Sequence, residues 1–386
     1  MGCPTPLMSP DLGLAPNLLL DFAASDTPRP QLDKTLLNGI IMKHGSPYGT
    51  HRVLEPLGVL PQPAWKLDNT MAIFDNEILI DVSALNIDSA SFTQIKSVCD
   101  NDEARIAAHV QDTVAQRGKQ HNPVTGSGGM LIGTVAQIGP ALAGKIDLKV
   151  GDKIATLVSL SLTPLRIDLI KKVHLHQDQV EIQGQAILFE TGLYAKLPAD
   201  MDEKLALAIL DVAGAPAQTA RLVKPGNTVV VIGGGGKSGT LCVYEAKKQA
   251  GPTGCVIGVS PFAKDCQRMK ELGWADHALQ VDATNALALM EAVAKVTNGQ
   301  LADVVINCVN IQNTEMGSIL AAKQHGKIYF FSMATRFTAA ALGAEGVGKD
   351  VEMIVGNGYA TGHAEHALNL LRESPKLRAL FEQLYV

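Results

Sequence analysis

The sequence predicts an α/β protein of two domains, in which a mostly antiparallel β domain precedes a doubly wound parallel sheet. Its 386 residues are enough for two sizeable hydrophobic cores. Short strand-like runs separated by Gly and Asp turns fill much of the first half. Beyond Pro198, strand-like and helix-like segments alternate regularly, which is typical of a parallel sheet covered by helices. We therefore expect one domain over residues 1–205 and a second over residues 206–386.

The first domain begins with an irregular segment. Between Pro28 and Asn69 recurring prolines exclude a long helix, and charged and aromatic side chains are frequent. The strands that we expect after it cover residues 77–85, 130–138, 153–160 and 186–189. Residues 89–120 have a helical pattern, so the antiparallel strands are interrupted once by helix.

The second domain opens with an Ala-rich helix over residues 203–223, which Pro216 should kink or divide. The strands that we expect next cover residues 229–232, 255–259, 278–281, 303–309, 327–332 and 351–355. The helices between and after them cover residues 237–250, 263–272, 285–297, 314–324 and 362–380.

A glycine motif follows the first of these strands. Gly234, Gly236 and Gly239 have the G-x-G-x-x-G spacing of a Rossmann dinucleotide-binding unit. The first glycine allows the turn, the second lets the backbone approach a pyrophosphate, and the third lets helix and strand pack closely. The phosphates would lie on free N–H groups at the helix N-terminus, where Lys237 and Ser238 stand. A turn that serves only sheet packing is the alternative.

The end of the next strand bears on the choice between NAD and NADP. NAD-binding units usually have an acidic residue there, which binds the ribose 2′-hydroxyl, whereas this chain has Ser260. A serine can donate to a 2′-phosphate, and Lys264 and Arg268 are near enough in sequence to supply positive charge. Either NADP or NAD is therefore expected, unless both cations merely solvate the following helix.

Composition excludes several classes of function. The net charge of −5, with no basic stripe, argues against a nucleic-acid partner. No window approaches the ~18 continuous apolar residues of a membrane span. The N-terminus lacks the pattern of a secretory signal, and the six cysteines form no C-x-x-C pair. We expect a cytoplasmic protein that forms a homo-oligomer, namely a dimer.

Two phrases resemble the medium-chain dehydrogenase/reductase superfamily. GTVAQIG followed by LKVGDKI looks like its GroES-like β domain, and ARLVKPGNTVVVIGGGGKSG looks like the entry into its Rossmann domain. A closer resemblance lies in GTHRVLEPLGVLPQPAWKLDN, Gly49 to Asn69, together with GGGGKSG and the strand end INCVN. These phrases resemble the family of L-erythro-3,5-diaminohexanoate dehydrogenases.

The closer resemblance implies an activity and a set of contacts. Enzymes of that family oxidise the amine on carbon 3 with a nicotinamide cofactor, releasing 5-amino-3-oxohexanoate and ammonia in lysine fermentation. A small amino acid is then the substrate. At the INCVN strand end, Asn307, Cys308 and Val309 would contact the cofactor.

The sequence also predicts that no metal is required. Zinc alcohol dehydrogenases of the superfamily have a Cys and a His-Glu pair at positions that fall here near Asn86 and on Gly129 and Met130. An alcohol normally needs a metal to approach alkoxide character, whereas an amine needs only to lose an ammonium proton. Amine oxidation without metal is thus reasonable. The alternatives are a zinc-free quinone or enone reductase and a non-enzymatic NADPH-binding protein.

A diamino acid needs partners for one carboxylate and two ammonium groups. We expect Arg52 to clamp the carboxylate, with Tyr48 and His51 alongside it. Lys43 belongs to the same polar segment, and Glu55 from this segment is one candidate for the remote ammonium.

Two aspartates complete the predicted site. Asp211 is the other candidate for the remote ammonium. Asp88 lies near the position where metal-containing relatives keep a proton-relay hydroxyl, so it is the candidate general base. The alternative for Asp88 is a helix cap.

Overall fold

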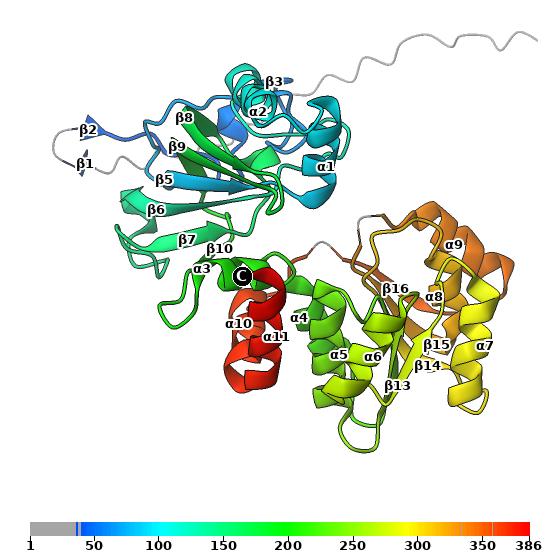
Figure 1. Cartoon of the computed structure of the whole chain (residues 1–386). Coiled ribbons are helices and arrows are strands. Elements are labelled where there is room, and N and C mark those ends of the chain that lie inside the picture. Colours follow the sequence, from blue (N-terminus) through cyan, green and yellow to red (C-terminus); the bar gives the residue numbers. More distant parts are fainter. Residues whose placement is uncertain (1–35, 38–39, 333, 357) are drawn as a thin grey trace, which may run out of the picture.

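Two β-sheets of different strand direction divide the structure into two lobes (Figure 1). The structure is a computed structural model, and it describes residues 36–37, 40–332, 334–356 and 358–386. The predicted fold class is confirmed, because one sheet is antiparallel and the other is parallel.

The first lobe is built on a six-stranded antiparallel sheet with strand order β10-β7-β6-β5-β9-β8. Its strands are β5 (Glu77–Asn86), β6 (Met130–Ile138), β7 (Lys153–Thr156), β8 (Leu165–His174), β9 (Gln179–Phe189) and β10 (Tyr194–Lys196). Helices α1 (Ser89–Val98) and α2 (Glu103–Arg117) bury their apolar faces in the core of this sheet. The sequence did not predict β8, because four charged side chains interrupt its apolar positions.

The second lobe contains a six-stranded parallel sheet with strand order β13-β12-β11-β14-β15-β16. Its strands are β11 (Thr228–Ile232), β12 (Cys255–Ser260), β13 (His277–Gln280), β14 (Ala302–Asn307), β15 (Ala322–Phe330) and β16 (Glu352–Val355). The helices around it are α5 (Lys237–Ala250), α6 (Ala263–Leu272), α7 (Ala286–Val296), α8 (Glu315–Ala321) and α9 (Phe337–Gly346). Two separate apolar clusters, one on each face, show that this sheet is buried on both sides. This is the Rossmann strand order.

The Ala-rich helix is divided, as the presence of Pro216 predicted, and the last helix, which was predicted as a single segment, is divided as well. Residues 203–223 form α3 (Glu203–Leu210) and α4 (Gly214–Leu222), and Pro216 lies in the first turn of α4, where no intrahelical N–H is needed. The last helix is divided into α10 (His363–Glu373) and α11 (Pro375–Tyr385), because Ser374 caps a new helix that begins with proline. Helix α9 was not predicted.

Helices α3, α10 and α11 join the two lobes (Figure 1). Apolar side chains of these helices share one cluster with side chains from the first sheet: Ala84, Ile132, Ala155 and Ala195 from the sheet, Leu205 and Ile209 from α3, and Leu370, Leu377 and Phe381 from α10 and α11. The C-terminal helices therefore return to the first lobe. A boundary between residues 205 and 206 falls inside α3, and the division into domains stays a prediction.

The segment before the first sheet contains short strands β1 (Leu36–Leu37), β2 (Ile40–Ile41), β3 (Val53–Glu55) and β4 (Lys66–Leu67). β3 pairs with β4 through a register shift. None of the helices in the described ranges is long and apolar enough to cross a membrane.

Candidate active site

The glycine turn joins β11 to α5 at the C-terminal edge of the parallel sheet. Gly233 reverses the chain with a φ of +82°, and Gly236 caps α5. A Cβ at Gly239 would lie 1.9 Å from the Gly233 oxygen, so only glycine allows this close approach. A Cβ at Gly236 would meet only that oxygen, at 3.4 Å, so the space above Gly236 is open. A pyrophosphate can therefore reach the N–H groups of the first turn of α5.

Gly234 has a role different from the one that we expected. Its φ is not in the left-handed region, so it does not make the turn. A Cβ at Gly234 would lie 2.8 Å from Met269 Sδ and 3.2 Å from Val243 Cγ2. Gly234 therefore lets α5 and α6 pack against the turn, which Gly233 makes instead.

The end of β14 supports the glycine turn from the neighbouring strand. Asn307 is buried, donates to Thr314 Oγ1 at 2.8 Å and Ser318 Oγ at 3.0 Å, and accepts from the Val309 N–H at 3.1 Å. Val309 packs against Gly233, where a Cβ would lie 2.7 Å from Val309 Cγ1. These contacts fix the loop beside the turn. Its contact with a cofactor stays a prediction.

Cys308 faces α5 rather than open space. Its Sγ is 3.7 Å from Sγ of Cys242, and burial raises the pKa of the Cys242 thiol. Cys308 therefore packs between the end of β14 and helix α5.

At the end of β12 the structure reveals an acidic residue that the sequence analysis overlooked. Ser260 is buried, and its hydroxyl donates to Asp265 Oδ2 at 2.8 Å. Arg268 donates to Asp265 Oδ1 at 3.0 Å and also to the Gly235 oxygen. A Cβ at Gly235 would lie 2.4 Å from the Asp265 carboxyl carbon, so this carboxylate stands directly over the glycine turn. Ser260 and Arg268 are thus both engaged by Asp265, while Lys264 is exposed.

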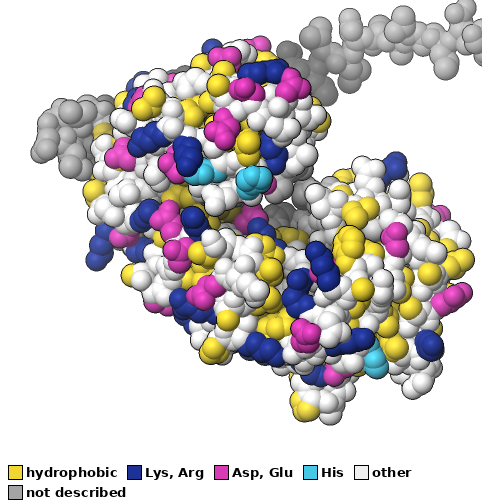
Figure 2. All heavy atoms as spheres, viewed as in Figure 1, with side chains coloured by type: hydrophobic (Ala, Val, Ile, Leu, Met, Phe, Trp, Pro, Cys, Tyr) yellow, Lys and Arg dark blue, Asp and Glu magenta, His cyan; other side chains and the backbone are white. Residues whose placement is uncertain are grey.

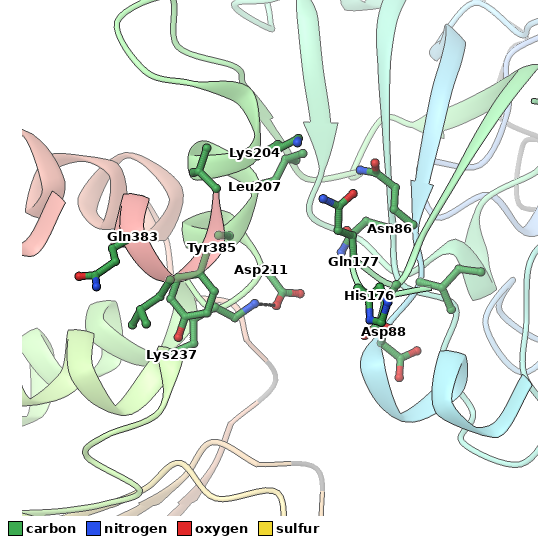
Figure 3. Close-up of a pocket in the computed structure, with 16 residues that line it drawn as sticks. Asn86, Asp88, His176, Gln177, Lys204, Leu207, Asp211, Lys237, Gln383 and Tyr385 are labelled. Atoms are coloured by element: carbon green, nitrogen blue, oxygen red, sulfur yellow. Dashed lines mark hydrogen bonds and ion pairs between the residues drawn. The ribbon is translucent and has the colours of Figure 1, made fainter. Parts of the chain in front are cut away.

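A cavity of about 440 Å³ lies between the lobes, beside the glycine turn (Figure 3). The first lobe lines it with Asn86, Ile87, Asp88, His176, Gln177, Asp178 and Gln179. The other wall consists of Lys204, Leu207, Ala208, Asp211, Lys237, Gln383, Leu384, Tyr385 and Val386. The surface is indented between the lobes, and basic side chains lie beside the indentation on the second lobe (Figure 2). Most of the lining is polar, so the cavity suits a small charged molecule.

Asp88 connects the cavity wall to α1. Its Oδ1 accepts from the Ser91 N–H at 3.0 Å, which caps α1. Its Oδ2 is buried and has no hydrogen-bond partner within the described part of the chain. The helix-cap interpretation of Asp88 therefore accounts for one oxygen, and the other is left without a partner among the described residues.

Asp211 and Lys237 form an ion pair on the opposite wall. Lys237 Nζ lies 2.6 Å from Asp211 Oδ2, which links the end of α3 to the first residue of α5. The same ammonium lies 5.8 Å from the centre of the Tyr385 ring. Asp211 is thus held beside the glycine turn and faces Asp88 across the cavity (Figure 3).

Comparison with known proteins identifies the family. Two relatives named L-erythro-3,5-diaminohexanoate dehydrogenase, from Acetoanaerobium sticklandii and Fusobacterium nucleatum, are 60% and 59% identical to the chain over 342 and 345 residues. The matches cover 89% of this chain and 99% and 100% of the relatives. The chain belongs to the L-erythro-3,5-diaminohexanoate dehydrogenase family.

Further comparisons agree with this family. Residues 51–198 match the L-erythro-3,5-diaminohexanoate dehydrogenase N-terminal domain, and residues 239–347 match the family described as zinc-binding dehydrogenase. A mycobacterial protein whose structure was solved in complex with NADPH has a TM-score of 0.51 and 17% identity, over 78% of this chain and 81% of that one. This likeness shows the shared fold.

The segment that carries the family resemblance does not form the expected substrate clamp. Arg52 is fully buried, and its Nε and Nη2 donate to Glu77 at 3.0 and 2.6 Å. Its remaining donors bind the backbone oxygens of Thr70 and Ala72. The prediction that Arg52 binds a substrate carboxylate is corrected, because its guanidinium is used inside the protein.

His51 belongs to the same buried cluster, since its Nε2 lies 2.8 Å from Glu77 Oε1. Burial raises the pKa of Glu77, but hydrogen bonds from His51, Arg52 and the Phe74 N–H outweigh it, so the pKa is lowered. This cluster fastens the irregular segment to the edge of β5. It is a structural device rather than a ligand site.

The other polar residues of the segment also lie away from the cavity. Lys43, Tyr48 and Glu55 are exposed, and none of them lines the cavity that contains Asp88 and Asp211. Of the predicted substrate residues, only Asp88 and Asp211 are brought together with the glycine-turn residue Lys237. The expected roles of Lys43, Tyr48 and Glu55 stay predictions, to which the lining of this cavity gives no support.

Three residues that line the cavity were not predicted as site residues: His176, Gln177 and Lys204. His174 ends β8 and pairs with Glu181, whereas His176 lies in the following turn, so the two histidines do not share a strand face. A useful signal was the spacing of Lys204 and Asp211, which places them two helical turns apart on one face.

Asn86, Gly129 and Met130 are the positions at which the sequence comparison with zinc alcohol dehydrogenases would place the metal ligands. Asn86 lines the cavity, and a Cβ at Gly129 would lie 2.1 Å from the Asn86 oxygen, so a side chain at Gly129 would displace the backbone. Across the residues described, no group of three His, Cys, Asp or Glu side chains is placed to hold a metal. Metal independence stays a prediction, as do the cytoplasmic location and the dimeric state.

Proposed function

We propose that the protein catalyses the reversible oxidative deamination of L-erythro-3,5-diaminohexanoate to 5-amino-3-oxohexanoate and ammonia, using a nicotinamide cofactor. The observation that carries this proposal is the 60% identity to relatives of that name over nearly their entire length. Fold alone would not support it, because the same fold hosts many chemistries. The cavity adds a set of groups suited to a diamino acid.

The glycine turn fits a dinucleotide cofactor. The space above Gly236 is open, and the first turn of α5 offers N–H groups and the positive end of the helix dipole to a pyrophosphate. Asn307 and Val309 hold the neighbouring loop in place. When bound, the nicotinamide accepts a hydride from carbon 3 of the substrate.

Asp88 is the proposed general base. An alkyl ammonium has a pKa near ~10, so it must lose a proton before the nitrogen lone pair can form a C=N bond. Asp88 lines the cavity, and its Oδ2, which has no hydrogen-bond partner among the described residues, is the atom proposed to accept this proton. Asp88 releases this proton to solvent after carbon 3 has lost its hydride. The regained carboxylate then accepts a proton from the water molecule that adds to the iminium carbon and passes it to the departing nitrogen, while the remaining hydroxyl proton goes to solvent. Addition of that water and departure of ammonia leave the ketone.

Asp211 is the proposed partner of the 5-ammonium group. One of its oxygens binds Lys237, and a carboxylate retains further lone pairs for a second cation. Because Lys237 fixes the carboxylate, little rotamer freedom is lost when the substrate binds. The ammonium that is not oxidised would therefore be held on the wall opposite Asp88.

Asp265 directs the cofactor preference toward NAD. Its carboxylate stands over the glycine turn, at the strand end where the adenosine ribose binds in Rossmann domains. A carboxylate accepts hydrogen bonds from ribose hydroxyls and repels a 2′-phosphate. Arg268 is bound by Asp265, so its charge is already compensated. Of the two cofactors expected from Ser260, Lys264 and Arg268, NAD is therefore the one that we propose.

A spectrophotometric assay tests the proposal. The purified enzyme should reduce NAD with L-erythro-3,5-diaminohexanoate, and it should consume NADH with 5-amino-3-oxohexanoate only when ammonium is present. Asp88→Asn should lower kcat about 100- to 10,000-fold with little change in cofactor binding. Reduction of an enone without ammonium, and no turnover of the diamino acid, would overturn the proposal. Activity that a chelator abolishes and zinc restores would contradict metal independence.

A further inference from the structure

The burial of Arg52 leaves the carboxylate of the proposed substrate without a partner. Three aspartates line the cavity, namely Asp88, Asp178 and Asp211. Asp178 is paired with Lys96 and Asp211 with Lys237, but a substrate carboxylate beside these acids still needs a cation of its own. Only Lys204, Lys237 and His176 among the lining side chains can carry a positive charge.

Two of these three are poorly suited. Lys237 is already paired with Asp211 at 2.6 Å and stands at the N-terminus of α5, where a pyrophosphate is expected. His176 lies in a turn on the same wall as Asp88, and a neutral imidazole offers no full charge. Lys204 is different, because its ammonium makes no ion pair with any residue that the structure describes.

We propose that Lys204 binds the substrate's carboxylate and thereby decides which amino group is oxidised. This inference rests on the proposed function. Lys204 extends from α3 into the cavity toward Asn86 and Gln177, on the same wall as Asp211 (Figure 3). The first turn of α3 carries Lys204, and the C-cap of α3 is Asp211.

The spacing along α3 matches the length of the substrate. Lys204 and Asp211 are seven residues apart, which corresponds to ~10 Å along a helix. In an extended 3,5-diaminohexanoate, five bonds of ~1.5 Å separate the carboxyl carbon from the 5-nitrogen. Because the chain is a zigzag, these bonds span about 6 Å end to end. A hydrogen bond of ~2.8 Å at each end brings the total to about 12 Å, which the long, flexible side chain of Lys204 can accommodate. One helix can therefore hold both ends of the molecule.

With its ends held on α3, the middle of the substrate is presented to the other wall. Carbon 3 lies between the two held groups, and Asp88 lies on the wall opposite α3 (Figure 3). The 3-ammonium would then meet the free Oδ2 of Asp88, whereas the 5-ammonium would stay on Asp211. Lys204 thus acts as a specificity-determining residue, because it sets the register of the chain in the cavity.

The test combines enzyme variants with an altered substrate. Kinetic constants of the wild type, Lys204→Met and Lys204→Arg are measured with L-erythro-3,5-diaminohexanoate and with its uncharged carboxamide. Lys204→Met should raise KM for the acid about 10- to 100-fold with a small change in kcat. Lys204→Arg, which keeps the positive charge, should have a KM close to that of the wild type. The carboxamide should be a poor substrate for the wild type, and Lys204→Met should not make it worse. This lack of additivity is the signature of a direct contact.

Controls separate this inference from the proposed function. Lys171→Met removes an exposed lysine of β8 that does not line the cavity, and it should leave all constants unchanged. If the wild type does not oxidise the diamino acid at all, the proposed function fails. If it does, but Lys204→Met either keeps the wild-type KM or raises it equally for acid and carboxamide, the role of Lys204 is refuted.

Discussion

The glycine turn and the segment Gly49–Asn69 both attract attention in the sequence, but only the first has the role that its residues suggest. The turn is local, since the strand, the glycines and the helix that form it are consecutive. In the other segment, the fate of Arg52 is decided by Glu77, which lies on β5. A site formed by the backbone can thus be recognised from the spacing of residues in the sequence. The role of a charged side chain, in contrast, cannot be inferred until the residue that pairs with it is known.

The largest effect should come from breaking the Arg52 cluster. Arg52→Met leaves the Glu77 carboxylate buried without its main partner, so the free energy of unfolding should fall by about 3–5 kcal/mol. Chemical denaturation measures this loss, and KM of the folded enzyme should not change. Arg52→Met combined with Glu77→Leu should recover part of the stability. A stable Arg52→Met enzyme with a raised KM for the amino acid substrate would contradict this comparison of the two segments, because it would mean that Arg52 binds the substrate.

A smaller effect concerns Lys119, which fastens the same segment. Its ammonium is buried and donates to the oxygens of Pro61 and Gln62, and burial followed by the neighbouring Arg117 lowers its pKa to about 8. Between that value and the pKa of ~10.4 in the unfolded chain, the unfolded state binds more protons, so stability should rise with pH. The rise due to this group is at most about 3 kcal/mol.

Lys119→Met isolates this contribution, because all other titrating groups are kept. The difference in unfolding free energy between wild type and variant should grow in favour of the wild type from pH 7.5 to pH 10. An equal difference at both pH values would mean that Lys119 keeps an ordinary pKa.

The glycine turn is tested by two matched substitutions. Gly236→Ala should leave the melting temperature nearly unchanged, because its Cβ meets only one oxygen at 3.4 Å, but it should weaken cofactor binding about 10- to 100-fold. Gly239→Ala should instead destabilise the fold, since its Cβ would lie 1.9 Å from the Gly233 oxygen. Nucleotide titration and thermal melting distinguish the two. Equal behaviour of both variants would remove the distinction between a ligand glycine and a packing glycine.

The smallest expected effect is on cofactor choice. Asp265→Asn removes the negative charge over the glycine turn and releases Arg268, so the ratio of kcat/KM for NADP to that for NAD should rise about tenfold. Lys264→Met, at an exposed neighbouring position, serves as the control. A parallel loss with both cofactors would place Asp265 away from the ribose.

The sequence was sufficient for the order of most elements and for the nucleotide turn, because these depend on local periodicity and spacing. It also led to Asp88, by its position after β5. The spacing of Lys204 and Asp211 places both on one face of α3, but it does not reveal that this face lines a cavity. That depends on how α3 packs against α10 and α11, whose residues come more than 150 positions later. Asp265 was not predicted, for a similar reason. It lies in the first turn of α6, and only the fold brings it over Gly235.

The charges that line the cavity also distinguish the substrate from the product. Three aspartates and two lysines line the cavity, so the lining side chains carry one net negative charge when His176 is neutral; Lys96, which pairs with Asp178, lies outside this lining. The diamino acid, with two ammonium groups and one carboxylate, carries one net positive charge, whereas the amino keto acid is neutral overall. Oxidation therefore cancels the long-range attraction that drew the substrate in, and the organic product is free to depart. Added salt should accordingly raise KM for the diamino acid more than for the keto acid.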